Sequence, residues 1–115
     1  MKYFLSLLFL LFSFNSLLAQ SQLGGDSILI DYGNPQQYEI GGVVISGTQF
    51  LDEAVLINIS GLTVGDTIEV PGEKISKAIE NLWKQGLFAD IKIVATRTQG
   101  KQIFFEIRLQ ERPRL

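Results

Sequence analysis

The residues that could carry chemistry are few in this sequence and stand apart from one another. The 115 residues include no histidine and no cysteine, so nucleophiles that depend on either residue are excluded. A transition-metal site would also lack its usual nitrogen and sulfur ligands. The carboxylates are scattered, and alone they would hold only a hard cation. We therefore expect no metal and no cofactor.

Two short patterns are similar to catalytic motifs but lack the arrangement that catalysis needs. Ser76 and Lys77 are neighbours, yet adjacent residues of a helix point about 100° apart and do not face each other. Gly41 and Gly42 are followed neither by the spacing of a dinucleotide-binding loop nor by a phosphate-binding lysine. The sequence therefore predicts a protein that is not an enzyme.

The first 19 residues differ from the rest of the chain. Lys2 precedes an uncharged stretch rich in Leu and Phe, from Tyr3 to Leu18, and the small residue Ala19 follows. This order is typical of an export signal, so we predict a signal peptide over 1–19. The alternative is a retained membrane anchor, although the apolar stretch is shorter than the ~20 residues that span a bilayer comfortably.

The chain without this segment is small and weakly acidic. Nine basic residues then face twelve acidic ones, which argues against nucleic acid, because that partner requires a basic face. Residues 20–37 are polar and Gly- and Pro-containing, and we predict a flexible lead-in there. Its apolar island, residues 28–30, either docks on the domain as a short strand or stays mobile. A domain of roughly 75–80 residues is marginal alone, and without disulfides we expect neighbouring domains to support it.

The first half of the domain reads as a strand followed by a short helix. Residues 38–46 alternate in the manner of a strand. Asp52 is a suitable N-cap for a helix, in which Val55 and Ile59 extend an apolar stripe from Leu51. Gly61 ends this helix, because glycine adopts the left-handed conformation without strain. Residues 62–70 are expected to be a connector.

The second half reads as a longer helix and two strands. Residues 72–85 contain apolar residues at helical spacing from Ile75 to Trp83, and Gly86 follows. Residues 91–97 and 103–109 alternate as strands, and Pro113 prevents the last strand from continuing. The order is β-α-α-β-β. The sequence thus predicts an α+β domain, with two antiparallel helices packed on one face of a three-stranded mixed sheet.

Four segments of the chain resemble the family of polypeptide-transport-associated (POTRA) domains. They are Val43-Val44-Ile45-Ser46-Gly47, Gly65-Asp66-Thr67, Ile79-Glu80-Asn81-Leu82-Trp83-Lys84-Gln85-Gly86-Leu87-Phe88-Ala89-Asp90-Ile91 and Glu111-Arg112-Pro113. The longest is similar to the family pattern of an apolar helix, Gly, an apolar-Phe pair, and Asp before an aliphatic residue. The resemblance implies a POTRA domain over 38–112, with 113–115 as the start of a linker to a missing next domain.

An export signal before a first POTRA domain resembles the BamA-like outer-membrane protein assembly factors, in a Bacteroidetes-type version. The resemblance implies a location on the periplasmic side of the outer membrane. The implied partners are unfolded outer-membrane proteins, other subunits of the assembly machinery and neighbouring POTRA domains. BamA-like proteins continue with further POTRA domains and a membrane β-barrel, so we expect this chain to be truncated. Two alternatives are the POTRA module of a two-partner-secretion transporter and that of an inner-membrane-anchored division protein.

The candidate binding site follows from the strand order that the resemblance implies, which is first, third, second. This order places residues 91–97 at an edge of the sheet, where unpaired N–H and C=O groups can receive an extended peptide. The alternative is an ordinary edge, which Lys92 and Arg97 protect from pairing. The edge residues are Ile91, Lys92, Ile93, Val94, Ala95, Thr96 and Arg97.

A second candidate patch comprises Val44 and Phe104, with Val94 beside them, on the helix-free face; residues 28–30 could cover it. We interpret the other motif residues as structural, and we expect Trp83 and Phe88 to pack in the core rather than to anchor a partner. The motif residues that we interpret as structural are Gly47, Gly61, Gly65, Asp66, Leu82, Trp83, Gly86, Phe88, Asp90, Glu111, Arg112 and Pro113.

Overall fold

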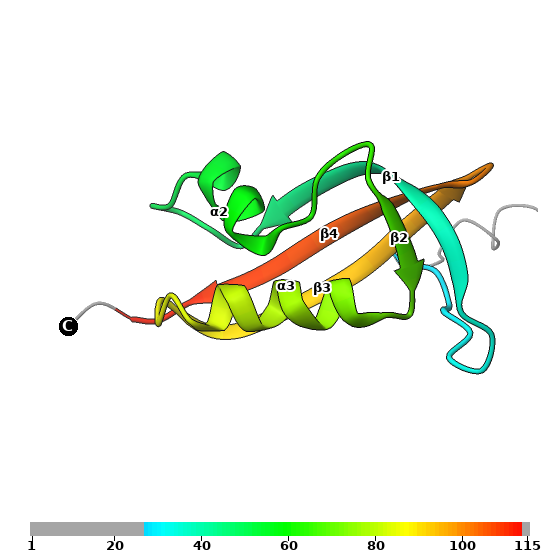
Figure 1. Ribbon diagram of the computed structural model, residues 1–115. Coiled ribbons are helices and arrows are strands. Elements are labelled where there is room, and N and C mark those ends of the chain that lie inside the picture. The colour runs from blue at the N-terminus through cyan, green and yellow to red at the C-terminus, as the bar shows by residue number, and fades with distance from the viewer. Residues whose placement is uncertain (1–26, 114–115) are drawn as a thin grey trace, which may run out of the picture.

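The computed structural model describes residues 27–113 (Figure 1). The export signal predicted over 1–19 lies outside the described residues, as do the first part of the lead-in (20–26) and the end of the predicted linker (114–115). Between residues 27 and 113, the helices are too short to cross a membrane.

Residues 27–113 form two helices and a four-stranded mixed sheet, so the predicted α+β class is confirmed. The strand order is β2-β1-β4-β3. β1 and β4 are parallel, whereas β3 is antiparallel to β4 and β2 is antiparallel to β1. The elements are β1 (Gln36–Ser46), α2 (Glu53–Ser60), β2 (Thr67–Val70), α3 (Glu73–Trp83), β3 (Phe88–Gln99) and β4 (Gln102–Glu111).

The prediction of three strands was wrong by one, because the expected connector contains β2. Ile68 and Val70 are buried while Thr67 and Glu69 are exposed, so this four-residue segment has the alternation of a strand. It pairs with Gln36–Glu39, which lengthens the first strand into the predicted lead-in. The expected order first, third, second is retained as β1, β4, β3.

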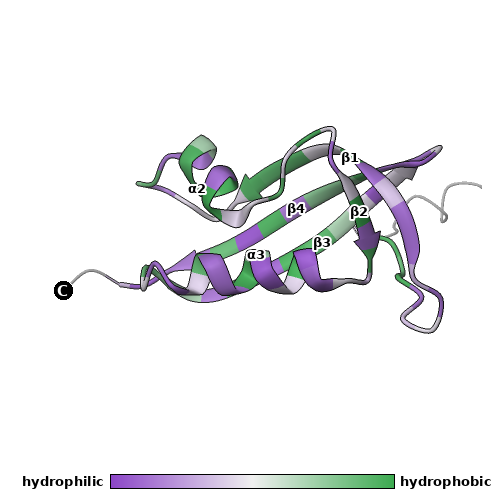
Figure 2. Cartoon of the chain, in the orientation of Figure 1, coloured by the Kyte–Doolittle hydropathy of each residue, from purple (hydrophilic) through white to green (hydrophobic). Residues whose placement is uncertain are grey.

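Both helices lie on one face of the sheet (Figure 1), and the core fills the space between these layers. β4 contributes Ile103, Phe105, Ile107 and Leu109, all of them buried, and the residues between them turn to the other face. Figure 2 shows this alternation as changing bands of hydropathy along β4. The largest side chains of the core include Phe88, Phe105 and Leu82.

Helix α2 begins and ends at the predicted residues but buries a different stripe. The Asp52 carboxylate accepts a hydrogen bond from the backbone N–H of Ala54 at 2.9 Å, and Gly61 follows the helix with φ +81°. Leu56 and Ser60 are buried, whereas Val55 is 52% exposed. The Ser60 hydroxyl donates to the carbonyl of Ile57, which satisfies a polar group inside the core.

Helix α3 is the longer helix and packs on the sheet through Ala78 and Leu82, which are fully buried. It ends at Trp83, two residues before the predicted end, and Gly86 takes the left-handed conformation shortly after it. The expectation that Trp83 packs in the core was wrong, since its side chain is 41% exposed. Leu82 lies at the centre of the apolar stripe of α3. Trp83 is the next residue, about 100° further around the helix, and therefore lies at the margin of the stripe.

The end of β1 approaches β4 closely at Gly47. This glycine has φ +88°, and a Cβ atom placed on it would lie 1.9 Å from the carbonyl oxygen of Leu109. No other residue type can adopt this φ without strain and also leave room for the neighbouring carbonyl. Gly47 therefore allows the first and last strands to stay together where β1 ends.

Candidate functional site

All seven predicted edge residues, 91–97, lie in β3, which is the outermost strand on its side of the sheet. The side chains of Ile91, Ile93 and Ala95 face the helices, and the first and last of these are buried. Lys92 is exposed on the helix-free face, beside the partly buried Val94 and Thr96. The predicted edge is thus an edge, with an apolar side and a polar side.

Every second residue of β3 directs its backbone N–H and C=O groups away from β4, toward the outer side of the sheet. The carbonyl of Ala95 points outward, because it accepts a hydrogen bond from the N–H of Ile28 at 2.8 Å. Alternation along an antiparallel strand directs the N–H and C=O groups of Ile91 and Ile93 to the same side. The register shifts of β3 lie on either side of this stretch, between Phe88 and Asp90 and between Ala95 and Arg97, so the pairing from Ile91 to Ala95 is regular. We call the outward groups of Ile91, Ile93 and Ala95 the open row.

The open row is occupied at one end by the lead-in. Apart from the bond from Ile28, no backbone hydrogen bond among residues 27–113 reaches the outer side of β3 from Ile91 to Ala95. The structure thereby answers the question left open for residues 28–30, since Ile28 and Ile30 pack against the core. Leu29 between them is fully exposed, so this segment alternates like a strand.

A groove of about 550 Å³ runs beside the open row, between β3 and α3. Ile93 and Ala95 line it from the sheet, Ile75 and Ile79 from the helix, and Ile30 with Tyr32 from the lead-in. Glu73 and Ser76 are the polar side chains of its lining. An extended segment lying along β3 would therefore find backbone groups to pair with and an apolar groove for every second side chain.

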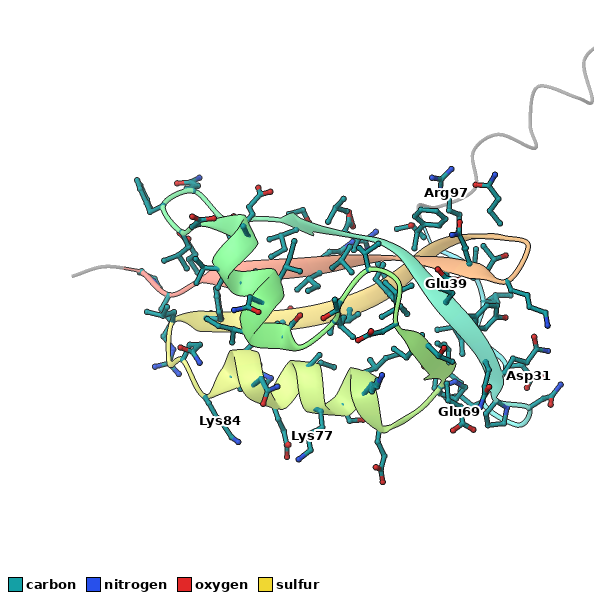
Figure 3. All side chains as sticks on the ribbon, turned by 45° about the horizontal axis from the view of Figure 1, so that its top comes forward. Asp31, Glu39, Glu69, Lys77, Lys84 and Arg97 are labelled. Atoms are coloured by element: carbon teal, nitrogen blue, oxygen red, sulfur yellow. The ribbon has the colours of Figure 1, made fainter. Side chains whose placement is uncertain are left out.

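The neighbouring Lys77 does not face this groove. Figure 3 shows Lys77 and Lys84 pointing away from the sheet, on the outer side of α3. Ser76, by contrast, is exposed at the rim of the groove. Ser76 and Lys77 are thus adjacent in the sequence, but only Ser76 lines the groove, so substitutions at the two positions can be compared directly.

The second candidate patch, Val44 and Phe104, is less available than expected. The ring of Phe104 lies against Gly41 and Gly42, where an added Cβ would come within 2.7 and 2.9 Å of it. The guanidinium of Arg97 also stacks over this ring, 4.1 Å from its centroid, close to the β3–β4 turn (Figure 3). Val44 remains 58% exposed.

The idea that residues 28–30 cover this patch was wrong, because they dock on the helix side of the sheet. There all three residues line one pocket with Val70 and Ile103, and Ile30 also lines the groove with Ile75. Val44 and Phe104 are on the opposite face, since they alternate along β1 and β4 with buried residues. The patch is therefore not covered by the lead-in.

The motif residues mostly have structural roles. Gly47, Gly61, Gly65 and Gly86 all have positive φ. The carbonyl of Asp66 accepts the N–H of Ile40 at 2.8 Å, which ties the turn before β2 to β1. Leu82 and Phe88 are buried, as expected, and Asp90 is exposed at the start of β3.

The Glu111-Arg112-Pro113 segment ties the end of β4 to its surroundings. Arg112 donates from Nε to the carbonyl of Phe88 at 3.1 Å and from its backbone N–H to Leu87 at 2.9 Å. The Glu111 carboxylate accepts the N–H of Gln49 at 3.4 Å. Pro113 follows, past the last residue of β4. These contacts order the exit of the chain.

Sequence reasoning missed the groove and therefore missed Ile30, Tyr32, Ile75 and Ile79 as residues of the site. The helix residues were assigned to the core, which they also contact. The signal that could have revealed the others was the alternation of Ile28, Leu29 and Ile30, which is too short to identify a partner strand.

Comparison with known proteins agrees with this architecture. Residues 38–112 match the POTRA family, described as "Surface antigen variable number repeat". No curated protein and no solved structure gave a match. The matched segment spans β1 almost from its start, both helices and the remaining strands. This chain therefore belongs to the POTRA family, whose domains bind other proteins in the periplasmic parts of outer-membrane assembly proteins.

Proposed function

We propose that this domain binds extended segments of other polypeptides by adding them as a further strand beside β3, and that it does not act as an enzyme. Its role would be that of a scaffold in a BamA-type machinery on the periplasmic side of the outer membrane. The clients would be unfolded outer-membrane proteins or partner subunits. The observation that carries the proposal is the open row of Ile91, Ile93 and Ala95 beside an apolar groove.

Pairing through the backbone suits a module with many clients. Main-chain N–H and C=O groups are the same in every sequence, so the hydrogen bonds would supply affinity without specifying residues. The groove would add a preference for apolar side chains at alternate positions, because Ile75, Ile79 and Ile93 line it. The client side chains at the intervening positions would point toward the helix-free face of the sheet, which carries Lys92.

The opposite edge of the sheet is less suitable for a client. β2 has four residues against twelve in β3, and short edge strands give little backbone to pair with. The ammonium group of Lys74 also donates to the carbonyl of Thr67 at 2.9 Å. A client strand is therefore expected at β3.

The test is an NMR titration of the chain, labelled at backbone amides and isoleucine methyl groups, with a short acetylated peptide. Isoleucine and threonine alternate in this peptide between terminal lysines. We expect shifts at Ile91, Ile93 and Ala95 and at the methyl groups of Ile75 and Ile79. The control peptide has the same side chains but carries N-methyl groups on the amides that would face β3, and it should bind at least about tenfold more weakly because several hydrogen bonds are lost.

Two neighbouring substitutions provide a matched pair on the protein. Ser76→Trp places a large side chain at the rim of the groove and should weaken the peptide severalfold, whereas Lys77→Trp places the same side chain on the outer side of α3 and should not. Shifts confined to α2, or equal binding of the N-methylated peptide, would contradict the proposal.

A further inference from the structure

The lead-in occupies part of the site just proposed. Residues 27–32, which we call the strap, donate one backbone hydrogen bond to the open row, from Ile28 to Ala95 at 2.8 Å. Ile28 and Ile30 pack against the core, and Ile30 and Tyr32 line the groove. The strap therefore sits where the end of a client strand would have to lie.

The strap has the form of a client but holds the edge weakly. Its side chains alternate between partly buried and exposed from Ser27 to Ile30, as an added strand would require. However, the strap makes one backbone hydrogen bond to the open row, and it does not pair with the outward N–H and C=O groups of Ile91 and Ile93. A client that pairs along all three residues would gain more bonds than the strap loses.

A fixed turn keeps the strap close to the edge. The Asp31 carboxylate accepts the N–H of Gly33 at 3.0 Å, and its carbonyl accepts the N–H of Asn34 at 3.3 Å. β1 begins two residues later. A segment tethered this closely competes at an effective concentration on the order of millimolar, so one hydrogen bond and two partly buried isoleucines suffice to hold it.

We propose that the strap is a built-in competitor that closes the Ala95 end of the β3 edge and is displaced by clients that pair along the whole open row. This inference rests on the proposed function, since it concerns access to the same edge. A displacing segment must offer an N–H that faces the carbonyl of Ala95 and apolar side chains at two alternate positions, to replace Ile28 and Ile30. Short or poorly patterned segments would be rejected because they cannot remove the strap.

The test compares two proline substitutions in the strap. Ile28→Pro removes the N–H that bonds to Ala95, while the extended backbone tolerates proline. Leu29→Pro is the matched control, because the Leu29 side chain is fully exposed and the backbone hydrogen bond to Ala95 comes from Ile28. Both substitutions are made in the full chain. If the purified protein retains its apolar N-terminal segment, the protein is prepared in lipid nanodiscs. Binding of the fluorescein-labelled isoleucine–threonine peptide is then measured by fluorescence anisotropy.

We expect Ile28→Pro to bind the peptide at least about fivefold more tightly than the unmodified chain, because the substitution removes a backbone hydrogen bond, which alone supplies about this factor, and also the partly buried Ile28 side chain. Leu29→Pro should change the affinity by less than about twofold. Isoleucine methyl spectra of the unmodified chain should show the signals of Ile28 and Ile30 moving to the positions of an unstructured segment as peptide is added.

The outcomes separate the two proposals. Equal affinity for all three proteins, with Ile28 and Ile30 unmoved by peptide, would overturn the strap as a competitor and leave edge binding intact. Absence of peptide binding to any of the three would overturn edge binding, and the competitor role would fail with it.

Discussion

The close approach of Gly47 to Leu109 allows the cost of one methyl group to be worked out from the structure. In Gly47→Ala the new Cβ would lie 1.9 Å from the Leu109 carbonyl oxygen, well inside any van der Waals contact. Residue 47 would also have to keep a φ of +88°, which costs about 1–2 kcal/mol for an alanine. Relief of the clash requires β1 and β4 to separate at this end, and such overpacking typically costs about 1–3 kcal/mol.

We therefore expect Gly47→Ala to lower the free energy of unfolding by about 3 kcal/mol, a large share of the ~5–10 kcal/mol available to a domain of this size. The assay is urea unfolding followed by the fluorescence of Trp83. Gly65→Ala is the matched control, because Gly65 has a similar φ of +96° and nothing within 4 Å of the added methyl group. It should lose only the backbone strain of about 1–2 kcal/mol. Equal losses in the two variants would refute the reasoning, since the carbonyl of Leu109 would then add nothing.

Two further predictions concern stability. Leu82→Ala should lower the free energy of unfolding by about 3 kcal/mol, because removal of this fully buried side chain leaves a cavity. Trp83→Ala should lower it by less than about 1 kcal/mol. If thermal unfolding gave the larger loss for Trp83→Ala, Trp83 would belong to the core after all. Asp52→Ala should cost about 1 kcal/mol through loss of the hydrogen bond to Ala54, and Glu53→Ala at the next position should change the midpoint of urea unfolding little.

The longer elements could be predicted from the sequence because their periodicity is uninterrupted. Helix α3 and strand β4 show nearly continuous patterns, and glycines mark the ends of both helices. Strand β2 could not be predicted in the same way. Its four residues contain two apolar side chains, and its partner, Gln36–Glu39, is largely polar. This pairing arises from tertiary contacts rather than from local pattern.

The site was predictable only in part. Placing residues 91–97 at an edge depended on the strand order implied by the family resemblance, because alternation alone does not say which strand lies outermost. The docking of Ile28 on Ala95 was not predictable, since three apolar residues within a polar segment do not indicate a partner. Trp83 is exposed because it lies about 100° around α3 from the fully buried Leu82, and helical spacing alone does not say which side of the apolar stripe the sheet covers.

The parallel pairing of β1 with β4 has a mechanical consequence. The chain enters the domain at the start of β1 and leaves it at the end of β4, and Glu39 pairs with Gln102 while Ser46 pairs with Arg108. A pull on the two ends therefore drags these strands past each other in shear, so that the hydrogen bonds between them bear the load together instead of opening one after another. Under tension the domain should act as a stiff link whose failure is governed by its unfolding rate.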